Sequence, residues 1–231
     1  MGLLAEAIED GDTKTVAINK SDWTVFYSGE YVKTIGVWGL SACSVFAIVS
    51  PHAAAIAHIG PNVLGSSSLT SFIELAKTLT DEVVQTCLDH PQLFPPESKT
   101  YIVCATLNNS VITAPEQLGI MYRGVQSLPH ASVLWHYEQS TEATINNNTH
   151  LGTFFVDGRS GSPRVFVEDR DITEAPTTAP VWKIATVGGQ MRYQLLISNV
   201  VIETLASPPV NQWISNGQKW VMWNGQSWTS Q

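Results

Sequence analysis

Two strongly apolar segments, separated by a short polar turn, stand in the first half of the chain. Residues 40–49 and 53–59 are apolar almost throughout, and no Asp, Glu, Lys or Arg occurs between Thr34 and Ser71. Continuous apolar runs without alternation are typical of strands that are buried on both faces. The Ser50-Pro51 pair between them favours a turn. We therefore predict a buried antiparallel hairpin over residues 40–59.

Helical spacing of apolar residues appears twice after this hairpin. Residues 69–88 place apolar side chains three and four positions apart, with acids and a lysine between them, which predicts an amphipathic helix packed on the sheet. Pro115 occupies a typical first-turn position, so residues 116–126 are predicted to form a second helix. Alternating or apolar segments predict the remaining strands, which are residues 23–27, 31–37, 101–107, 132–137, 152–157 and 163–168.

This order of elements predicts the fold class. Two helices set among mostly antiparallel strands indicate an α+β protein, with a layered, mainly antiparallel β-sheet or sandwich core and two outer helices. Proline and threonine are enriched over residues 171–180, which is typical of a linker or long loop. We therefore expect a main domain over residues 1–170 and a β-rich C-terminal extension over residues 171–231, packed on the main domain or linked to it.

The C-terminal extension is rich in tryptophan, since five of the eight tryptophans lie at position 182 or later. The sequence Asn-Gly-Gln-Lys-Trp at residues 216–220 recurs as Asn-Gly-Gln-Ser-Trp at residues 224–228. Asn-Gly is the strongest short hairpin signal, so residues 212–231 are predicted to form a three-stranded meander. The tryptophans have two interpretations: a stacking surface for a ligand, or packing that enlarges a small core.

Composition and charge exclude several function classes. The chain of 231 residues is 44% hydrophobic, which is enough for a substantial core. The net charge of −8 opposes binding to phosphate backbones, and because no Lys/Arg cluster offsets it we expect no nucleic-acid partner. Gly36, Gly39, Pro51 and Gly60 interrupt the uncharged tract, so we expect no membrane span there.

The three cysteines, Cys43, Cys87 and Cys104, are too few for a disulfide framework. No metal-binding spacing such as C-x2-C appears, and we expect neither a metal nor another cofactor. Residues 1–12 carry four acids and no base, the reverse of a secretory leader. A cytoplasmic, reducing location is therefore predicted, while the oligomeric state stays open.

Cys43 and His58 are the candidate catalytic pair. If the hairpin tip lies at Ser50-Pro51, residues whose numbers sum to 101 face each other, and Cys43 then lies opposite His58. Directly opposed residues have Cβ atoms about 4.5 to 5.5 Å apart, which allows an imidazole to take a thiol proton. A shift of the register by one residue would send one side chain to the opposite face. Cys87 and Cys104 fall in predicted helix and strand cores and are expected to be structural.

The motif around this pair resembles a known family. Leu40-Ser41-Ala42-Cys43, an apolar strand, a turn and Ala57-His58-Ile59-Gly60-Pro61 resemble the chemotaxis receptor glutamine deamidases and the catalytic domains of cytotoxic necrotising factor toxins. Their hallmark is L-x-G-C or G-S-C, with a histidine about fifteen residues later. The likeness in element order covers about residues 34–170.

The resemblance implies hydrolysis of glutamine side-chain amides, with Cys43 as the nucleophile and His58 as its base. Receptor deamidases place a threonine six residues before the cysteine to orient the histidine, and this chain has Val37 there. In the toxins a backbone carbonyl orients the histidine, so the resemblance points to the carbonyl of Val37. Ala42 stands where the family has Gly or Ser. Backbone N–H groups of Ala42 and Cys43 are the expected oxyanion donors.

Two function classes follow from these observations. The first is a cysteine-dependent amidohydrolase that acts on a protein or on a small amide substrate through a thioester. The second is a non-catalytic binding protein on a deamidase-like scaffold, which uses the Trp-rich C-terminal region for contact. The rates at which a thiol probe labels the three cysteines would separate the two classes, because only an activated Cys43 would react faster than the others.

Overall fold

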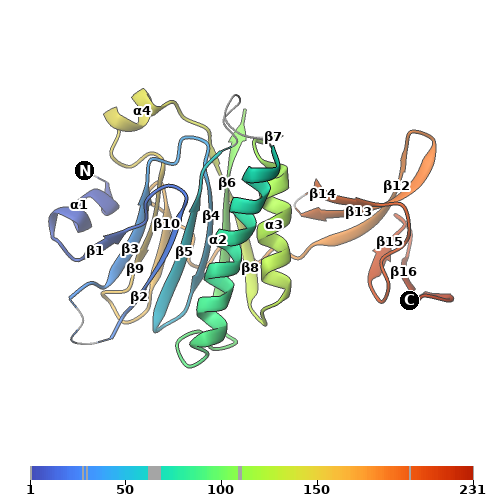
Figure 1. Cartoon of the computed structure of the whole chain (residues 1–231), viewed down its shortest axis with the longest axis horizontal. Helices are drawn as coiled ribbons and strands as arrows, with labels where there is room; N and C mark the ends of the chain where they lie inside the picture. The colour runs from blue at the N-terminus through green and yellow to red at the C-terminus, as the bar shows by residue number, and fades with distance from the viewer. Residues whose placement is uncertain are drawn as a thin grey trace. The chain divides into compact units, whose positions relative to one another are not determined.

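The structure is a computed structural model that describes residues 2–27, 29, 31–61, 69–108, 111–197 and 199–230. The chain divides into two compact units, Met1–Thr177 and Thr178–Gln231 (Figure 1). The division lies after Thr177 and not at residue 170, because strand β11 (Arg170–Asp171) pairs within the first unit and Ile172 is part of its core.

Two β-sheets form the centre of the first unit. The first sheet has the order β1 (Thr13–Thr15), β3 (Thr34–Trp38), β9 (Thr153–Asp157), β10 (Arg164–Val167) and β11. The second has the order β2 (Lys20–Val25), β5 (Ala53–Ile59), β4 (Ser44–Val49), β6 (Lys99–Leu107) and β7 (Val111–Ile112), and β8 (Ala131–Glu138) pairs with β6. The pairs β1–β3 and β6–β8 are parallel, and the other pairs in these sheets are antiparallel.

The two sheets pack face to face around one apolar core. Side chains of β3 and β9 from the first sheet meet side chains of β4, β5 and β6 from the second, including Ile35, Phe154, Val45, Ile56 and Val103. Every residue of β4 and β5 is buried, since these strands have the second sheet's neighbours on both edges and protein on both faces. This burial explains why the hairpin sequence contains no charge.

Helices cover the outer faces of this sandwich. Helices α2 (Leu69–Asp89) and α3 (Pro115–Gln126) lie on the second sheet, whereas α1 (Leu3–Glu9) packs on the first sheet through Leu4 and Ala7 (Figure 1). A short helix, α4 (Glu142–Asn147), follows β8. The predicted α+β class is confirmed, with the two predicted helices outside a mainly antiparallel, layered core.

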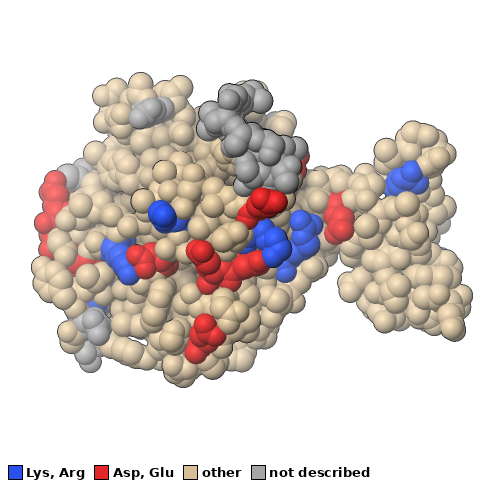
Figure 2. All heavy atoms as spheres, viewed as in Figure 1, with Lys and Arg blue, Asp and Glu red and all other residues tan. Residues whose placement is uncertain are grey.

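The outward face of α2 and α3 carries intermixed acids and bases (Figure 2). Lys77 and Asp81 form an exposed ion pair one helical turn apart, and Ser21 of β2 donates a hydrogen bond to Glu82. This solvated face accounts for the polar half of the helical pattern. Within the described ranges, no helix combines the length and the apolar character needed to cross a membrane.

The second unit is a six-stranded sheet with a core of its own. Its order is β14 (Val200–Leu205), β13 (Gln190–Ile197), β12 (Val181–Val187), β15 (Trp213–Ser215), β16 (Trp220–Trp223) and β17 (Trp228–Ser230). The last three strands form the predicted antiparallel meander. Trp182, Leu195 and Ile214 are buried on one face, and Tyr193 stacks with Trp228 at a ring separation of 6.3 Å. Strands β12 to β14 were not anticipated in the sequence.

Candidate functional site

The turn of the central hairpin sets the position of Cys43 relative to His58. The hairpin closes at Ser50 and Ala53, with Pro51 and His52 at its tip, so that facing residues sum to 103: Val45 pairs with His58, and Ser44 with Ile59. The expected direct opposition of Cys43 and His58 is therefore wrong. The Ser50 N–H donates to the Ala53 carbonyl across this two-residue tip, and the Ser50 hydroxyl accepts from the N–H groups of His52 and Ala53.

Cys43 and His58 still point to the same side of the sheet. The register differs from the expected one by two residues, and side chains alternate with a period of two, so the shift does not change the face. Cys43 lies two residues before Val45, which is the partner of His58. Diagonal neighbours of this kind are about 7 to 8 Å apart in a regular ladder. Cys43 belongs to the core between the sheets and is 1% exposed, while His58 is 2% exposed.

One ring nitrogen of His58 is fixed by a backbone carbonyl. Nδ1 lies 3.2 Å from the carbonyl oxygen of Val16, in the segment between β1 and β2. Since a carbonyl oxygen can only accept, Nδ1 carries the hydrogen and Nε2 presents a lone pair. That Nε2 is buried and has no hydrogen-bond partner among the described residues. The imidazole is thus held in the tautomer that a general base requires.

The carbonyl that contacts His58 belongs to Val16 and not to Val37, as the sequence suggested. Val37 is buried in β3, where it pairs with Phe154 of β9. The segment that carries Val16 makes two further hydrogen bonds at the end of β5. The N–H of Asn19 donates to the His58 carbonyl, and the Asn19 side chain accepts from the N–H of Gly60. Val16, which precedes β2, therefore has the role expected for Val37, the orientation of His58 by a backbone carbonyl.

The turn that carries Cys43 is held by three long-range hydrogen bonds. The N–H of Leu40 donates to the carbonyl of Gly152 at 2.8 Å, and the N–H of Ser140 donates to the carbonyl of Ser41 at 3.1 Å. The buried hydroxyl of Tyr137, on β8, donates to the carbonyl of Cys43 at 2.7 Å. These bonds fix the backbone of the candidate nucleophile from two neighbouring segments.

A surface cavity of about 440 Å³ lies beside this turn. Its described lining carries no charged side chain and consists of Ser41, Ala42, Pro61, Leu107, Thr113, Ala114 and Gln139. Cys43 itself does not line the cavity, but backbone hydrogen bonds at Ala42 and Ser41 lower the pKa of its thiol. The Ser41–Ala42 backbone therefore contacts both the sulfur and the cavity, next to the N–H groups of Ala42 and Cys43 that were expected as oxyanion donors.

Burial determines the charge of both candidate residues. It raises the pKa of the Cys43 thiol to about 11, against the opposing backbone hydrogen bonds, and it lowers the pKa of the His58 imidazole to about 4. Both groups are therefore neutral near pH 7. This arrangement is a neutral base beside a protonated thiol, and not an ion pair of imidazolium and thiolate.

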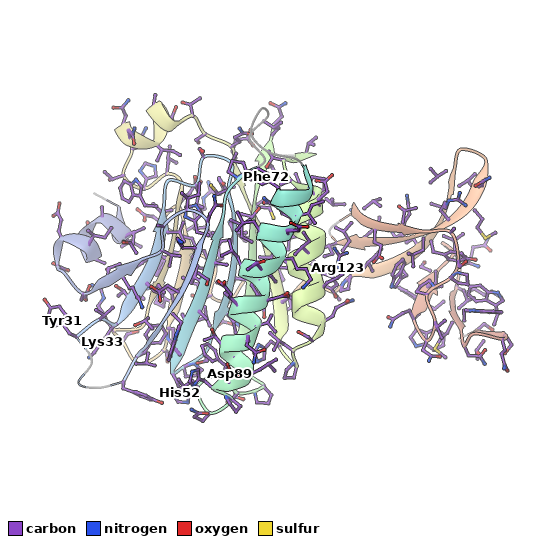
Figure 3. All side chains as sticks on the ribbon, viewed as in Figure 1. Tyr31, Lys33, His52, Phe72, Asp89 and Arg123 are labelled. Atoms are coloured by element: carbon purple, nitrogen blue, oxygen red, sulfur yellow. The ribbon has the colours of Figure 1, made fainter. Side chains whose placement is uncertain are left out.

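The other cysteines and histidines do not join this site. Cys104 is buried in β6, and burial raises its thiol pKa to about 12; Cys87 in α2 has the same shift for the same reason. His52 is exposed at the hairpin tip, and in Figure 3 it lies at the same end of the view as Asp89, at the end of α2, and at the opposite end from Phe72, near the start of that helix. Among the described residues, no three His, Cys, Asp or Glu side chains group in a way that would hold a metal ion.

Two residues of the site escaped the sequence analysis. Val16 contributes only its carbonyl, so its side chain gives no signal. Gln117 is a buried polar residue on the apolar side of the second helix, which was a readable signal. A scan against protein-family models and a search of curated proteins both find no match to this chain.

Proposed function

We propose that this protein is a cysteine-dependent amidohydrolase that deamidates glutamine side chains, with Cys43 as the nucleophile and His58 as the general base. The observation that carries this proposal is the His58 ring. Its Nδ1–H is bound to the Val16 carbonyl, and its Nε2, on the face that Cys43 shares, is buried and has no partner in the part of the chain that the structure describes. A buried nitrogen without a partner is costly, which favours a functional reason for it.

The proposed reaction begins with proton transfer from the Cys43 thiol to His58 Nε2. The sulfur attacks the amide carbon, and the resulting oxyanion is stabilised by backbone N–H groups at Ala42 and Cys43. Nε2 returns the proton to the leaving nitrogen, and ammonia departs as the C–N bond breaks. Water then hydrolyses the thioester, giving glutamate and the free thiol. The reaction requires no metal and no other cofactor.

A protein or a small neutral amide is the proposed substrate. The described cavity lining carries no charge, which suits an uncharged carboxamide. We place the reaction in the cytoplasm, because all three cysteines are free and such thiols persist in a reducing compartment. Nucleic acid is not a proposed partner, given the net charge of −8.

The test is a mass-spectrometric comparison of a candidate-target lysate treated with wild type or with Cys43→Ser. Wild type should produce glutamine peptides that gain roughly one mass unit as glutamine becomes glutamate, and Cys43→Ser should not. Cys87→Ser, which alters a second buried cysteine of the same unit, is the matched control and should behave as wild type. Equal gains with Cys43→Ser, or no gain with wild type in any candidate lysate, would contradict the proposal.

The second candidate function is binding through the Trp-rich unit. Trp213 and Trp220 are 36% and 42% exposed, and the register places both on the face opposite the buried Ile214. Exposed aromatics of this kind are enriched at contact surfaces. Slow and equal labelling of Cys43, Cys87 and Cys104 by a maleimide would favour this function. Faster labelling of Cys43 that His58→Gln abolishes would favour the amidohydrolase.

A further inference from the structure

Gln117 connects the strand that carries Cys43 to the strand that carries His58. It is the third residue of α3 and is 5% exposed. Its Nε2 donates to the carbonyl of Gly60 at 2.7 Å, and its Oε1 accepts from the hydroxyl of Ser44 at 2.9 Å. The carbonyl of Gly60 can only accept, so the orientation of the Gln117 amide is determined. We call this pair of hydrogen bonds the Gln117 bridge.

The bridge stands where the backbone pairing of the hairpin ends. Ser44 and Ile59 are the last paired residues of β4 and β5. Cys43 precedes Ser44, and Gly60 follows Ile59, so the candidate nucleophile lies just beyond the last ladder pair and the candidate base just inside it. Without further ladder bonds, the separation of the two chain segments at this point depends on side-chain contacts. The Gln117 amide makes one such contact, and its hydrogen bonds to Ser44 and to Gly60 are both buried.

The start of α3 also belongs to the cavity wall. Thr113 and Ala114, immediately before the helix, line the cavity beside Ser41 and Ala42. One side chain of the helix therefore ties the nucleophile strand, the base strand and part of the cavity wall together. Gln117 lies on the helix-covered face of the second sheet, whereas Cys43 and His58 point into the core between the sheets, so it does not contact the reacting atoms.

We propose that Gln117 is a positioning residue that sets the separation of Cys43 from His58, an inference that rests on the proposed function. A displacement of about 1 Å between reacting groups is enough to lower a rate about a hundredfold. Loss of the bridge should therefore weaken the action of His58 on Cys43 without removing either residue. It should also leave the buried carbonyl of Gly60 without its Gln117 donor.

The test uses Gln117→Met, which keeps the length of the side chain and removes both hydrogen bonds. The matched control is Ser50→Ala, which removes buried side-chain hydrogen bonds at the opposite end of the same hairpin but keeps the backbone bond from the Ser50 N–H to the Ala53 carbonyl, and with it the register. The measurement is the alkylation rate of Cys43 from about pH 5 to about pH 9, followed by peptide mass spectrometry. Gln117→Met should slow it about tenfold at neutral pH, as His58→Gln does, while Ser50→Ala should stay within about twofold of wild type.

A double variant separates positioning from general destabilisation. If Gln117 acts through the pair, His58→Gln combined with Gln117→Met should be no slower than the slower single variant. Multiplied effects, or an equal loss in Ser50→Ala, would overturn the inference. If Gln117→Met does not fold, Ser44→Ala removes the Oε1 contact, together with the Ser44 contact to the Cys104 thiol, and keeps the bond from Gln117 to Gly60; the same non-additivity with His58→Gln is expected.

The failure of this inference is distinguishable from the failure of the proposed function. If His58→Gln leaves the Cys43 rate unchanged, no catalytic pair exists, and both proposals are wrong. If His58→Gln slows Cys43 but Gln117→Met behaves as Ser50→Ala does, only the positioning role is wrong and the pair stands.

Discussion

Acidification from about pH 6.5 to about pH 4 should destabilise the first unit through His58. Burial lowers the pKa of this imidazole in the folded protein from 6.5 to about 4. Between these values the unfolded chain binds a proton that the folded chain does not bind. The stability that the neutral His58 provides is therefore complete above about pH 6.5 and is lost as the pH falls towards about 4.

The size of this loss follows from the shift. One pKa unit corresponds to about 1.4 kcal/mol, so the loss approaches about 3 kcal/mol below both values. At about pH 5 the same two pKa values give about 2 kcal/mol. His130 and His136 add a loss of the same sign, since burial also lowers the pKa of each. The difference between wild type and His58→Gln isolates the contribution of His58.

Urea unfolding at about pH 7.5 and about pH 5, followed by circular dichroism at 222 nm, measures this difference. The described helices all lie in the first unit, so the helical signal reports on that unit. Wild type should lose about 2 kcal/mol more than His58→Gln between the two pH values. An equal loss in both proteins would show that His58 titrates as an exposed histidine, and the buried neutral base would have to be abandoned.

Two further predictions concern the hydroxyl that holds Cys43 and the core of the second unit. Tyr137→Phe should lower the free energy of unfolding by about 1 to 2 kcal/mol and should slow Cys43 alkylation, because the Cys43 carbonyl loses its donor. Tyr101→Phe, which loses a similar hydrogen bond to the Thr173 carbonyl, should also lower the free energy of unfolding but should not slow the alkylation of Cys43. Equal slowing of this alkylation in both variants would contradict the role of Tyr137. Trp182→Ala should cost about 3 to 5 kcal/mol in the tryptophan-fluorescence transition, while the exposed Trp220→Ala should cost about 0.5 kcal/mol or less. Similar losses in the two tryptophan variants would contradict the assignment of this core.

Apolar patterns in the sequence predicted the central elements well. The uncharged hairpin and the amphipathic helix over residues 69–88 appear as β4, β5 and α2, because burial on two faces or on one stripe leaves a clear pattern. Strands β12 and β13 were missed although Gly188 and Gly189, both with positive φ, join them. Gly-Gly is a hairpin signal, but the proline-rich stretch before it led us to expect a linker or long loop and no strand immediately after it.

The register of the hairpin could not be read from the sequence with the same certainty. Ser50-Pro51 has the composition of a two-residue tip, but the tip of the structure is Pro51-His52, one position later, and Ser50 pairs with Ala53 across it. Facing residues were expected to sum to 101 and in fact sum to 103. Because side chains alternate with a period of two, both candidate residues still point to the same face. An error of one position would have separated them.

The residue that orients His58 was beyond sequence reasoning for a different reason. Every residue has a carbonyl, so a contact made by the Val16 main chain leaves no trace in the identity of the side chain. The resemblance indicated a backbone carbonyl, but only the path of the chain between β1 and β2 selects Val16 over Val37. Gln117, in contrast, is a polar residue within the buried stripe of α3 and can be recognised as an exception to the pattern.

The neutral state of the pair constrains how the proposed reaction can proceed. With pKa values of about 11 and about 4, moving the proton from Cys43 to His58 costs about 10 kcal/mol before the attraction of the two charges is counted. At an effective dielectric constant of about 20 and the diagonal separation of about 7 to 8 Å, that attraction returns about 2 kcal/mol. The remainder lies well below the barrier of about 17 kcal/mol that corresponds to one turnover per second. A stable thiolate is therefore not required: proton transfer can accompany attack on the amide, and His58 serves as a base because it stays neutral.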